Sequence, residues 1–427
     1  MSHMNAANTP IPLAERVLAI GESASVAAAQ RVRELKAAGI EMVNFTVGEP
    51  DFDTPSNIRD AAVAAIDAGL TRYTAVTGIP ELATAIVSKA KLRTGVDYAP
   101  SEVTIGGGAK QVIFLALMAT VEPGVEVLVP TPYWVSYPDM VRAHGGTPVI
   151  VDSSAEDSYL PTTDDLERAI TPATGWIILN TPGNPSGASY DEQALREIAA
   201  LLDRHRHVHV LADDIYDEIT FTEGPGTHLL RVAPHLKDRV LVVNGVSKTY
   251  AMTGWRIGYA TGEANLIAAI NKLQSQSSSC PSSISQAAAA EALTGDQSFV
   301  AEAVKTYRAR RDLICELLNR IDGLEVTAPD GSFYAFVDCS GLIGRRTPDG
   351  IVLVDDQAVV LHLLDSAHVA TIAGSAYGVA DHFRISFATS IEQLRAGAQQ
   401  IRRAVDQLSP ASDTSPSSHD SSERRNQ

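Results

Sequence analysis

The chain has 427 residues, of which 45% are hydrophobic and 20% are charged, so it is long enough for two globular domains with substantial cores. Its formal net charge of -17 argues against binding to nucleic acid or to an anionic membrane, because phosphate-binding surfaces need clustered Lys and Arg. No apolar run approaches the roughly 20 residues that a membrane helix needs, and Cys280, Cys315 and Cys339 lack metal-binding or redox spacing, so we expect a cytoplasmic protein with reduced thiols and no metal site.

The two ends of the chain are expected to lie outside the folded domains. The first four residues, MSHM, look like the remnant of a cleaved tag with Met4 as the natural start, and we assign residues 1–15 to this remnant and an N-terminal arm. Residues 409–427 contain almost no apolar side chains, so they cannot bury enough surface to offset their chain entropy. We therefore expect a disordered C-terminal tail.

Between about residue 17 and residue 408, short β-branched runs alternate with longer amphipathic or Ala-rich stretches, which is typical of an α/β protein. The expected strands are short and apolar, and a loop rich in Gly, Pro, Ser or Asp follows each: residues 126–129, 147–151, 175–179, 207–212 and 240–243. Such runs suit a sheet that helices cover on both faces. Because ligands bind at the carboxyl ends of parallel strands, we expect the functional residues in these loops.

The pattern changes beyond about residue 297. A long charged helix is predicted over residues 300–321, and strands are predicted over residues 331–337 and 382–387. We interpret this part as a second, smaller α+β domain. The expected division is residues 16–57 and 298–408 for the small domain and residues 58–297 for the large domain.

The most informative segment is VVNGVSKTYAMTGWRIGYA, residues 242–260. An apolar strand delivers Ser247 and Lys248 into a loop, and Arg256 follows eight residues after the lysine. Burial would lower the pKa of the lysine and make its amine available for imine chemistry, and the guanidinium could hold a phosphate with two N–H donors. An isolated Ser-Lys pair is usually only a surface feature, so the interpretation depends on the whole segment.

The whole segment resembles the lysine motif of fold-type I aminotransferases of class I/II, and bacterial aspartate aminotransferases in particular. The resemblance extends over most of residues 17–408 and implies a mainly parallel seven-stranded sheet in a large domain that binds pyridoxal phosphate (PLP). It also implies that Lys248 holds the cofactor as a Schiff base and later carries the proton, while Arg256 and Ser247 bind the cofactor phosphate. Gly245 departs from the many relatives that have a phosphate-binding serine there.

Other motifs are similar to the cofactor-binding residues of this family. Asp213 follows a strand in VLADDIYDEI, and it would keep the pyridine nitrogen protonated, so that the ring accepts electrons. The resemblance assigns Tyr216 and Asn184 to the ring oxygen, Asn184 also to the substrate carboxylate, and Trp134 to stacking on the ring and to the substrate. The other acidic residues of the same segment are interpreted as a loop cap: Asp214, Asp217 and Glu218.

The Gly-rich turn IGGGAKQ, residues 105–111, opens a helix predicted over residues 112–120, so its free backbone N–H groups form a potential phosphate site. The resemblance assigns the amides of Gly108 and Ala109 to the phosphate. It assigns Lys110 to the distal carboxylate of an acidic substrate. Tyr73 would reach the phosphate of a neighbouring subunit, so we expect a homodimer with shared active sites.

Arg384 stands at the start of an alternating apolar pattern in HFRISFATS, and a charged side chain in such surroundings needs a partner. The resemblance implies that this arginine grips the substrate α-carboxylate as a fork, and that Gly48 belongs to a loop that closes over the substrate. Lys110 and Arg384 together favour a dicarboxylic amino acid such as aspartate, with 2-oxoglutarate as the acceptor. Gly21 stands where relatives that act on larger acids can carry a basic residue, so prephenate is not favoured.

Two other functions remain open. The same residues can serve β- or γ-elimination, replacement or cyclisation, and three departures keep this alternative: Gly245, Pro182-Gly183 before Asn184, and Ala83 where relatives often have Arg. A PLP-binding regulatory module fused to a DNA-binding domain would need an N-terminal helix-turn-helix and a basic face. Only about a dozen residues precede the resemblance, which argues against that module.

Two attractive patterns do not require a function. His205, His207 and His209 alternate like metal ligands, but no carboxylate or Cys stands at a suitable spacing, so we interpret them as structural or solvated. The serine-rich residues 274–286 are either a low-complexity stretch or, following the resemblance, part of the active-site rim.

Overall fold

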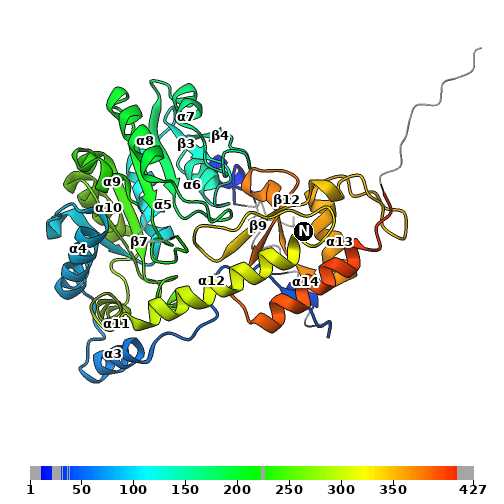
Figure 1. Ribbon diagram of the computed structural model, residues 1–427. Helices are drawn as coiled ribbons and strands as arrows, with labels where there is room; N and C mark the ends of the chain where they lie inside the picture. The colour runs from blue at the N-terminus through cyan, green and yellow to red at the C-terminus, as the bar shows by residue number, and fades with distance from the viewer. Residues whose placement is uncertain are drawn as a thin grey trace, which may run out of the picture.

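In this computed structural model, the described residues are 11–21, 30, 32–35, 37, 39–222 and 227–410. Figure 1 shows a larger body and a smaller body, which the long helix α12 (Ser298–Leu318) connects. Residues 411–427 of the expected tail lie outside the described residues, as do residues 1–10 of the expected arm. Ser409, the first residue of the expected tail, exchanges two backbone hydrogen bonds with Arg346.

A seven-stranded sheet forms the centre of the larger body, with the strand order β2-β8-β7-β6-β5-β3-β4. Its strands are β2 (Val103–Gly106), β3 (Glu126–Pro130), β4 (Thr147–Val151), β5 (Thr174–Asn180), β6 (His209–Asp213), β7 (Val240–Gly245) and β8 (Gly258–Thr261). Only β8 among them runs antiparallel to its neighbours. The predicted mainly parallel seven-stranded sheet is confirmed, and each of the five strands expected between residues 126 and 243 is present.

Helices cover both faces of this sheet. They are α3 (Ser56–Asp67), α4 (Pro80–Thr94), α5 (Ala109–Thr120), α6 (Tyr137–Ala143), α7 (Thr163–Ala169), α8 (Glu192–Arg204), α9 (Leu229–Val232), α10 (Ala264–Ser277) and α11 (Ser283–Thr294). Val127 and Val129 of β3 pack in one core with α5, α6 and α10, whereas Leu128 between them packs in another core with α7, α8 and α9. Because successive side chains point to opposite faces, these three neighbouring residues all have to be apolar.

The smaller body contains a three-stranded antiparallel sheet of order β11-β12-β9 and a two-stranded parallel pair. Its elements are β1 (Val43–Asn44), β9 (Tyr334–Asp338), β10 (Val369–Ala370), β11 (Ile372–Ala373), β12 (His382–Ser386), α13 (Asp356–Ala367) and α14 (Ile391–Val405), and the short helix α1 (Glu15–Leu18) precedes them in the chain. One core joins residues 43 and 45 to residues 303–405. This core supports the domain division that we propose: residues 16–57 with 298–408, and residues 58–297.

The same core also takes up residues of the larger body. Ile215, Tyr216, Ile219 and Phe221 follow directly after β6, and they pack among side chains of the smaller body. Asp213, at the end of β6, instead remains hydrogen-bonded within the seven-stranded sheet. The turn after β6 therefore bridges the two bodies.

Glycines allow α5 to approach the sheet closely. Gly258 of β8 pairs with Gly106 on one side and with Gly245 on the other. A Cβ at residue 258 would overlap the backbone of Gly108 and Ala109, where α5 begins. A Cβ at residue 245 would lie 3.0 Å from the carbonyl oxygen of Ile257, so a serine at this position would require the paired strand to shift slightly.

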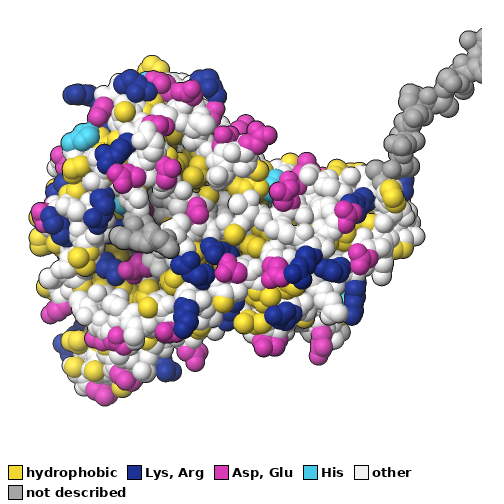
Figure 2. Space-filling view, in the orientation of Figure 1, with side chains coloured by type: hydrophobic (Ala, Val, Ile, Leu, Met, Phe, Trp, Pro, Cys, Tyr) yellow, Lys and Arg dark blue, Asp and Glu magenta, His cyan; other side chains and the backbone are white. Residues whose placement is uncertain are grey.

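Charges of both signs are mixed on the surface. On the face in Figure 2, Lys and Arg side chains are interspersed with Asp and Glu side chains. Within the described parts of the chain, no helix combines the length and the apolarity that crossing a bilayer requires. The three cysteines are free thiols.

Candidate functional site

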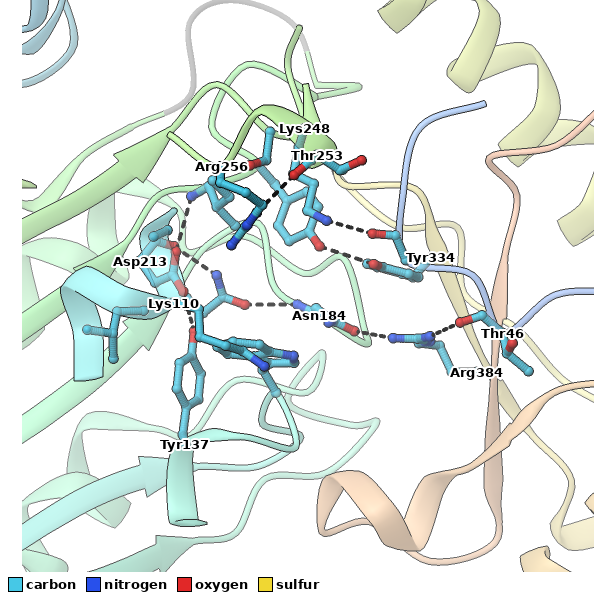
Figure 3. Close-up of a pocket in the computed structure, with 18 residues that line it drawn as sticks. Thr46, Lys110, Tyr137, Asn184, Asp213, Lys248, Thr253, Arg256, Tyr334 and Arg384 are labelled. Carbon is cyan, nitrogen blue, oxygen red and sulfur yellow. Dashed lines mark hydrogen bonds between the residues drawn. The ribbon is translucent and has the colours of Figure 1, made fainter. Parts of the chain in front are cut away.

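A cavity of about 360 Å³ lies between the two bodies (Figure 3). Among the residues that line it are most of the predicted site residues: Gly48, Ala109, Lys110, Trp134, Asn184, Asp213, Tyr216, Ser247, Lys248, Arg256 and Arg384. Gly108 and Tyr73 do not line the cavity. The topology explains the convergence, because the carboxyl ends of β5, β6 and β7 meet at one edge of the sheet and β12 supplies the opposite wall.

Lys248 projects into the cavity from the loop that follows β7. Its Nζ donates a hydrogen bond to the backbone oxygen of Gly48 at 2.6 Å. Burial lowers the pKa of the Lys248 amine to about 8, and the carboxylate of Glu49 opposes part of this shift. More of this amine is therefore uncharged near neutral pH than is the case for a solvated lysine.

Asp213 is 4% exposed and presents its carboxylate to the same cavity. Tyr137 Oη donates to its Oδ2 at 2.6 Å, and Asn180 Nδ2 donates to its backbone oxygen at 2.8 Å. Burial raises the pKa of the Asp213 carboxyl to about 6, although the hydrogen bond from Tyr137 opposes this shift. A cationic group in the cavity would stabilise the ionised carboxylate, so this wall suits a protonated ring nitrogen.

Arg384 of β12 forms the opposite wall and is held in a fixed orientation. Its Nη1 donates to Asn184 Oδ1 at 2.9 Å, its Nη2 donates to the backbone oxygen of Thr46 at 2.8 Å, and its guanidinium lies 4.3 Å from the centre of the Tyr334 ring. Arg384 Nε is buried and has no hydrogen-bond partner among the described residues. Leaving a buried donor without a partner costs free energy, so this arginine is suited to bind a carboxylate ligand, which would accept a hydrogen bond from Nε.

Two hydroxyl groups meet beside Arg384. The Tyr216 and Tyr334 hydroxyl oxygens lie 3.1 Å apart, and either can be the donor. Burial raises the pKa of the Tyr216 hydroxyl well above its ordinary value. Tyr216 is therefore a neutral hydrogen-bond donor for an oxygen atom in the cavity.

A candidate anion site lies at the start of α5. Arg256 Nη2 donates to the backbone oxygen of Gly107 at 3.1 Å, and Gly108 lies directly against this guanidinium. Lys110 Nζ lies 4.6 Å from the centre of the Trp134 ring, and burial lowers the pKa of the Lys110 amine. Neither cation pairs with a carboxylate among the residues that the structure describes. With the N–H group of Ala109 at the helix terminus, these cations suit a phosphate and a second carboxylate.

The serine-rich segment touches this anion site. Gln111 Nε2 donates to Ser278 Oγ at 2.8 Å, while Gln111 Oε1 accepts from the backbone N–H of Gly107 at 2.5 Å. Ser278 is thus linked through one glutamine to the Gly-rich turn, although no residue of this segment lines the cavity.

Several residues of the cavity were not predicted from the sequence. Tyr137 and Tyr334 stand in apolar surroundings, where an aromatic residue is usually assigned to a core. Asn180 at the end of β5 could have been found, because it precedes the expected loop. Thr46 contributes only its backbone oxygen, and because every residue has one, the sequence gives no sign of this contact. The others that line the cavity without having been predicted are Ile113, Ile215 and Thr253.

The histidines and Tyr73 lie elsewhere. His205 Nε2 lies 3.4 Å from Glu167 Oε1, and His207 Nε2 lies 3.0 Å from the backbone oxygen of Thr171. Within the described ranges, no group of three or more His, Cys, Asp or Glu is arranged to hold a metal ion. Tyr73 is 90% exposed on its own chain.

Comparison with known proteins gives a consistent result. The sequence profile of the family "Aminotransferase class I and II" matches residues 40–401. A probable aspartate/prephenate aminotransferase of Rhizobium leguminosarum bv. phaseoli is 46% identical over 391 residues, which are 92% of this chain and 98% of the relative. An aspartate aminotransferase of Rhizobium meliloti is also 46% identical, over 93% of this chain and 97% of the relative.

Solved structures are similar along nearly the whole chain. The crystal structure of the aspartate aminotransferase from Rhizobium meliloti superposes with a TM-score of 0.92 at 45% identity, covering 94% of this chain and all of that one. The aspartate aminotransferase of Thermus thermophilus with maleate gives a TM-score of 0.86 at 38% identity, covering 92% and 100% of the two chains.

Proposed function

The chain belongs to the class I and II aminotransferases, and from this membership we propose that it uses PLP to move an amino group from aspartate, or another dicarboxylic amino acid, to a 2-oxo acid such as 2-oxoglutarate. Amino-group transfer follows from the family. The observation that supports a dicarboxylic substrate is the separation of cations in one cavity, with Lys110 on one wall, Arg384 on the other and Lys248 between them (Figure 3).

The residues of the cavity fit PLP group by group. Arg256 and the N–H group of Ala109 would hold the phosphate, with Ser247 beside them, whereas the N–H of Gly108 already donates to the backbone oxygen of Gly106 at 2.8 Å. Asp213 would pair with the ring nitrogen, since its buried carboxylate accepts from Tyr137 and forms no ion pair with the described residues. The remaining contacts would be Trp134 on the ring face and Tyr216 and Asn184 at the ring oxygen.

When bound, PLP supplies an electron sink for the negative charge that develops at the substrate α-carbon. Lys248 contributes the amine that carries the cofactor, and this amine then takes and returns the α-proton at Nζ. Its lowered pKa favours this role, because the amine has to be uncharged to accept a proton. Gly48, whose carbonyl oxygen accepts from Nζ, keeps this amine directed into the cavity.

The substrate carboxylates would bind at opposite ends of the cavity. Arg384 offers its buried Nε and a free Nη hydrogen to the α-carboxylate. Lys110 offers an ammonium group to the distal carboxylate. At least six relatives are named aspartate/prephenate aminotransferases, five of them with the word probable. We propose aspartate in preference to prephenate, because, following the resemblance, Gly21 stands where relatives that act on larger acids can carry a basic residue.

Lys110→Ala tests this substrate assignment. We expect the KM for aspartate or glutamate to rise roughly 10- to 100-fold, because a charge-assisted hydrogen bond contributes about 1.5–3 kcal/mol. The KM for alanine, which has no distal carboxylate, should change little. Steady-state kinetics with the three donors measure this difference, and Lys91→Ala, an exposed lysine paired with Asp97, is the control. Equal effects on the three donors would remove the assignment.

The reaction itself is tested by the fate of the cofactor. We expect aspartate, without an acceptor, to convert enzyme-bound PLP to one equivalent of pyridoxamine phosphate per active site, and 2-oxoglutarate to restore PLP. Absorbance spectra and chromatography of the released cofactor measure both steps. Elimination, replacement or cyclisation would instead form product while the cofactor remains PLP, and that outcome would exclude transamination as the main reaction.

We also propose a cytoplasmic homodimer. Tyr73 is strongly exposed on its own chain, as is expected of a residue that reaches a neighbour's phosphate. The preceding helix α3 and its end present further exposed apolar side chains, namely Val63, Ile66 and Leu70. Exposed apolar side chains gathered in one region suit a second protein surface.

A further inference from the structure

Residues 46–54 run past the cavity, between β1 of the smaller body and α3 of the larger body. Two backbone oxygens of this segment contact the two cations on which the reaction depends. The Thr46 oxygen accepts from Arg384 Nη2 at 2.8 Å, and the Gly48 oxygen accepts from Lys248 Nζ at 2.6 Å (Figure 3). The position of this segment therefore decides where both cations point.

The segment is attached on one side to the lysine loop. Thr253 Oγ1 donates to Glu49 Oε2 at 2.8 Å, and Thr54 Oγ1 donates to the backbone oxygen of Ala251 at 2.6 Å. Trp255 Nε1 also donates to Thr54 Oγ1 at 3.0 Å. Just before the start of the segment, the backbone of Phe45 bonds to Ala370 and Ser386 of the smaller body, and a side-chain attachment lies further along, at Asp51.

That attachment is an ion pair with α12. Arg310 donates from Nη1 to Asp51 Oδ1 at 2.7 Å and from Nη2 to Oδ2 at 2.8 Å. Arg310 is 8% exposed, and its guanidinium lies 5.3 Å from the Phe52 ring centre and 5.7 Å from the Tyr307 ring centre. An arginine that binds a carboxylate with two hydrogen bonds, and that packs against two aromatic rings, holds the carboxylate in one orientation. A lysine cannot form this bidentate contact.

We propose that Asp51 and Arg310 are positioning residues for substrate binding: their ion pair holds residues 46–54 so that Arg384 and Lys248 face the incoming amino acid. The inference rests on the roles proposed above for those two cations. Thr46 and Asn184 together fix the plane of the Arg384 guanidinium, which leaves Nε and one Nη hydrogen for a carboxylate. Without the ion pair, the substrate has to order the segment when it binds.

This role predicts a particular kinetic pattern. The free-energy cost of ordering the segment arises when the substrate binds. It therefore destabilises the enzyme–substrate complex and the transition state by the same amount. Such a loss raises KM and leaves kcat nearly unchanged. A purely structural role would instead lower the fraction of folded enzyme, which lowers kcat without changing KM.

The experiment compares Arg310→Lys and Asp51→Asn with the unaltered holoenzyme. We expect each variant to raise the KM for aspartate and for 2-oxoglutarate about tenfold, with kcat within about twofold and the cofactor absorbance spectrum unchanged. The double variant should be no worse than either single variant, because both remove one interaction. Asp51 is partly exposed, so Asp51→Asn provides a test that does not alter a buried side chain.

Two matched controls accompany these variants. Arg311 is the next residue on α12, donates to the backbone oxygen of Pro329 and stacks on Phe221, so Arg311→Lys changes a similar side chain without touching the segment. Asp53→Asn removes an exposed carboxylate two residues from Asp51. Unchanged KM values in Arg310→Lys and Asp51→Asn, or the same increase in Arg311→Lys, would overturn the proposal. Failure of the proposed function would differ, because the unaltered enzyme would then convert no aspartate.

Discussion

Lys248→Ala enzyme, purified with excess PLP, is expected to lose the visible absorbance of the lysine–cofactor linkage and to lose turnover by about 10⁴-fold or more. The substitution removes both the amine that carries the cofactor and the group that moves the α-proton, and proton transfer by a positioned side chain alone contributes up to about 10⁴-fold. Absorbance spectra and kcat with aspartate measure the two losses separately.

A lysine of the surface serves as the comparison for Lys248. Lys91→Ala removes an ammonium group that is largely exposed and paired with Asp97, and it should leave spectrum and turnover intact. If Lys248→Ala retained the absorbance and full activity, the assignment of the cofactor to this lysine would be wrong.

Asp213→Asn should have the second largest effect. The variant keeps the size of the side chain but removes the negative charge from the wall that faces the ring nitrogen. Breaking one partner of a buried ion pair costs about 3–5 kcal/mol, so we expect kcat to fall by about 10²- to 10⁴-fold. Stopped-flow measurement of cofactor conversion after mixing with aspartate gives this rate directly.

Asp214 provides a close control for this prediction. It is the next residue, it is 1% exposed, and its Oδ2 lies 3.0 Å from His228 Nε2 rather than in the cavity. Asp214→Asn alters a carboxylate that is equally buried and is expected to affect stability more than chemistry. Equal losses of kcat in the two variants would show that the effect comes from the fold, not from contact with the cofactor.

Much of the fold could be predicted from the sequence. The family, the α/β class and amino-group transfer are confirmed by the comparisons. Each of the strands β3 to β7 contains a short apolar run, which makes it recognisable without any partner. β8 could not be recognised, because its four residues begin with glycine and its antiparallel direction depends on long-range pairing. β1, β10 and β11 have two residues each, too few to form a pattern.

The site was predictable where its residues stand in local motifs. Lys248, Arg256 and Asn184 have neighbours in sequence that identify them. Tyr137 and Tyr334 do not, because their hydroxyl partners are 76 and 118 residues away, and only the fold brings them together. The roles assigned to the predicted site residues, and the dimer, stay predictions until the variants are measured.

The turn after β6 has a consequence for any rotation of one domain against the other. Asp213 is anchored in the seven-stranded sheet, whereas Tyr216, three residues later, packs in the core shared with residues 303–405. The nitrogen of a bound pyridine ring would thus contact a residue of the larger body, and the ring oxygen would contact a residue packed in the core of the smaller body. A shift of one core against the other would change the distance between the Tyr216 hydroxyl and the Asp213 carboxylate, which are the groups that would hold the two sides of the ring.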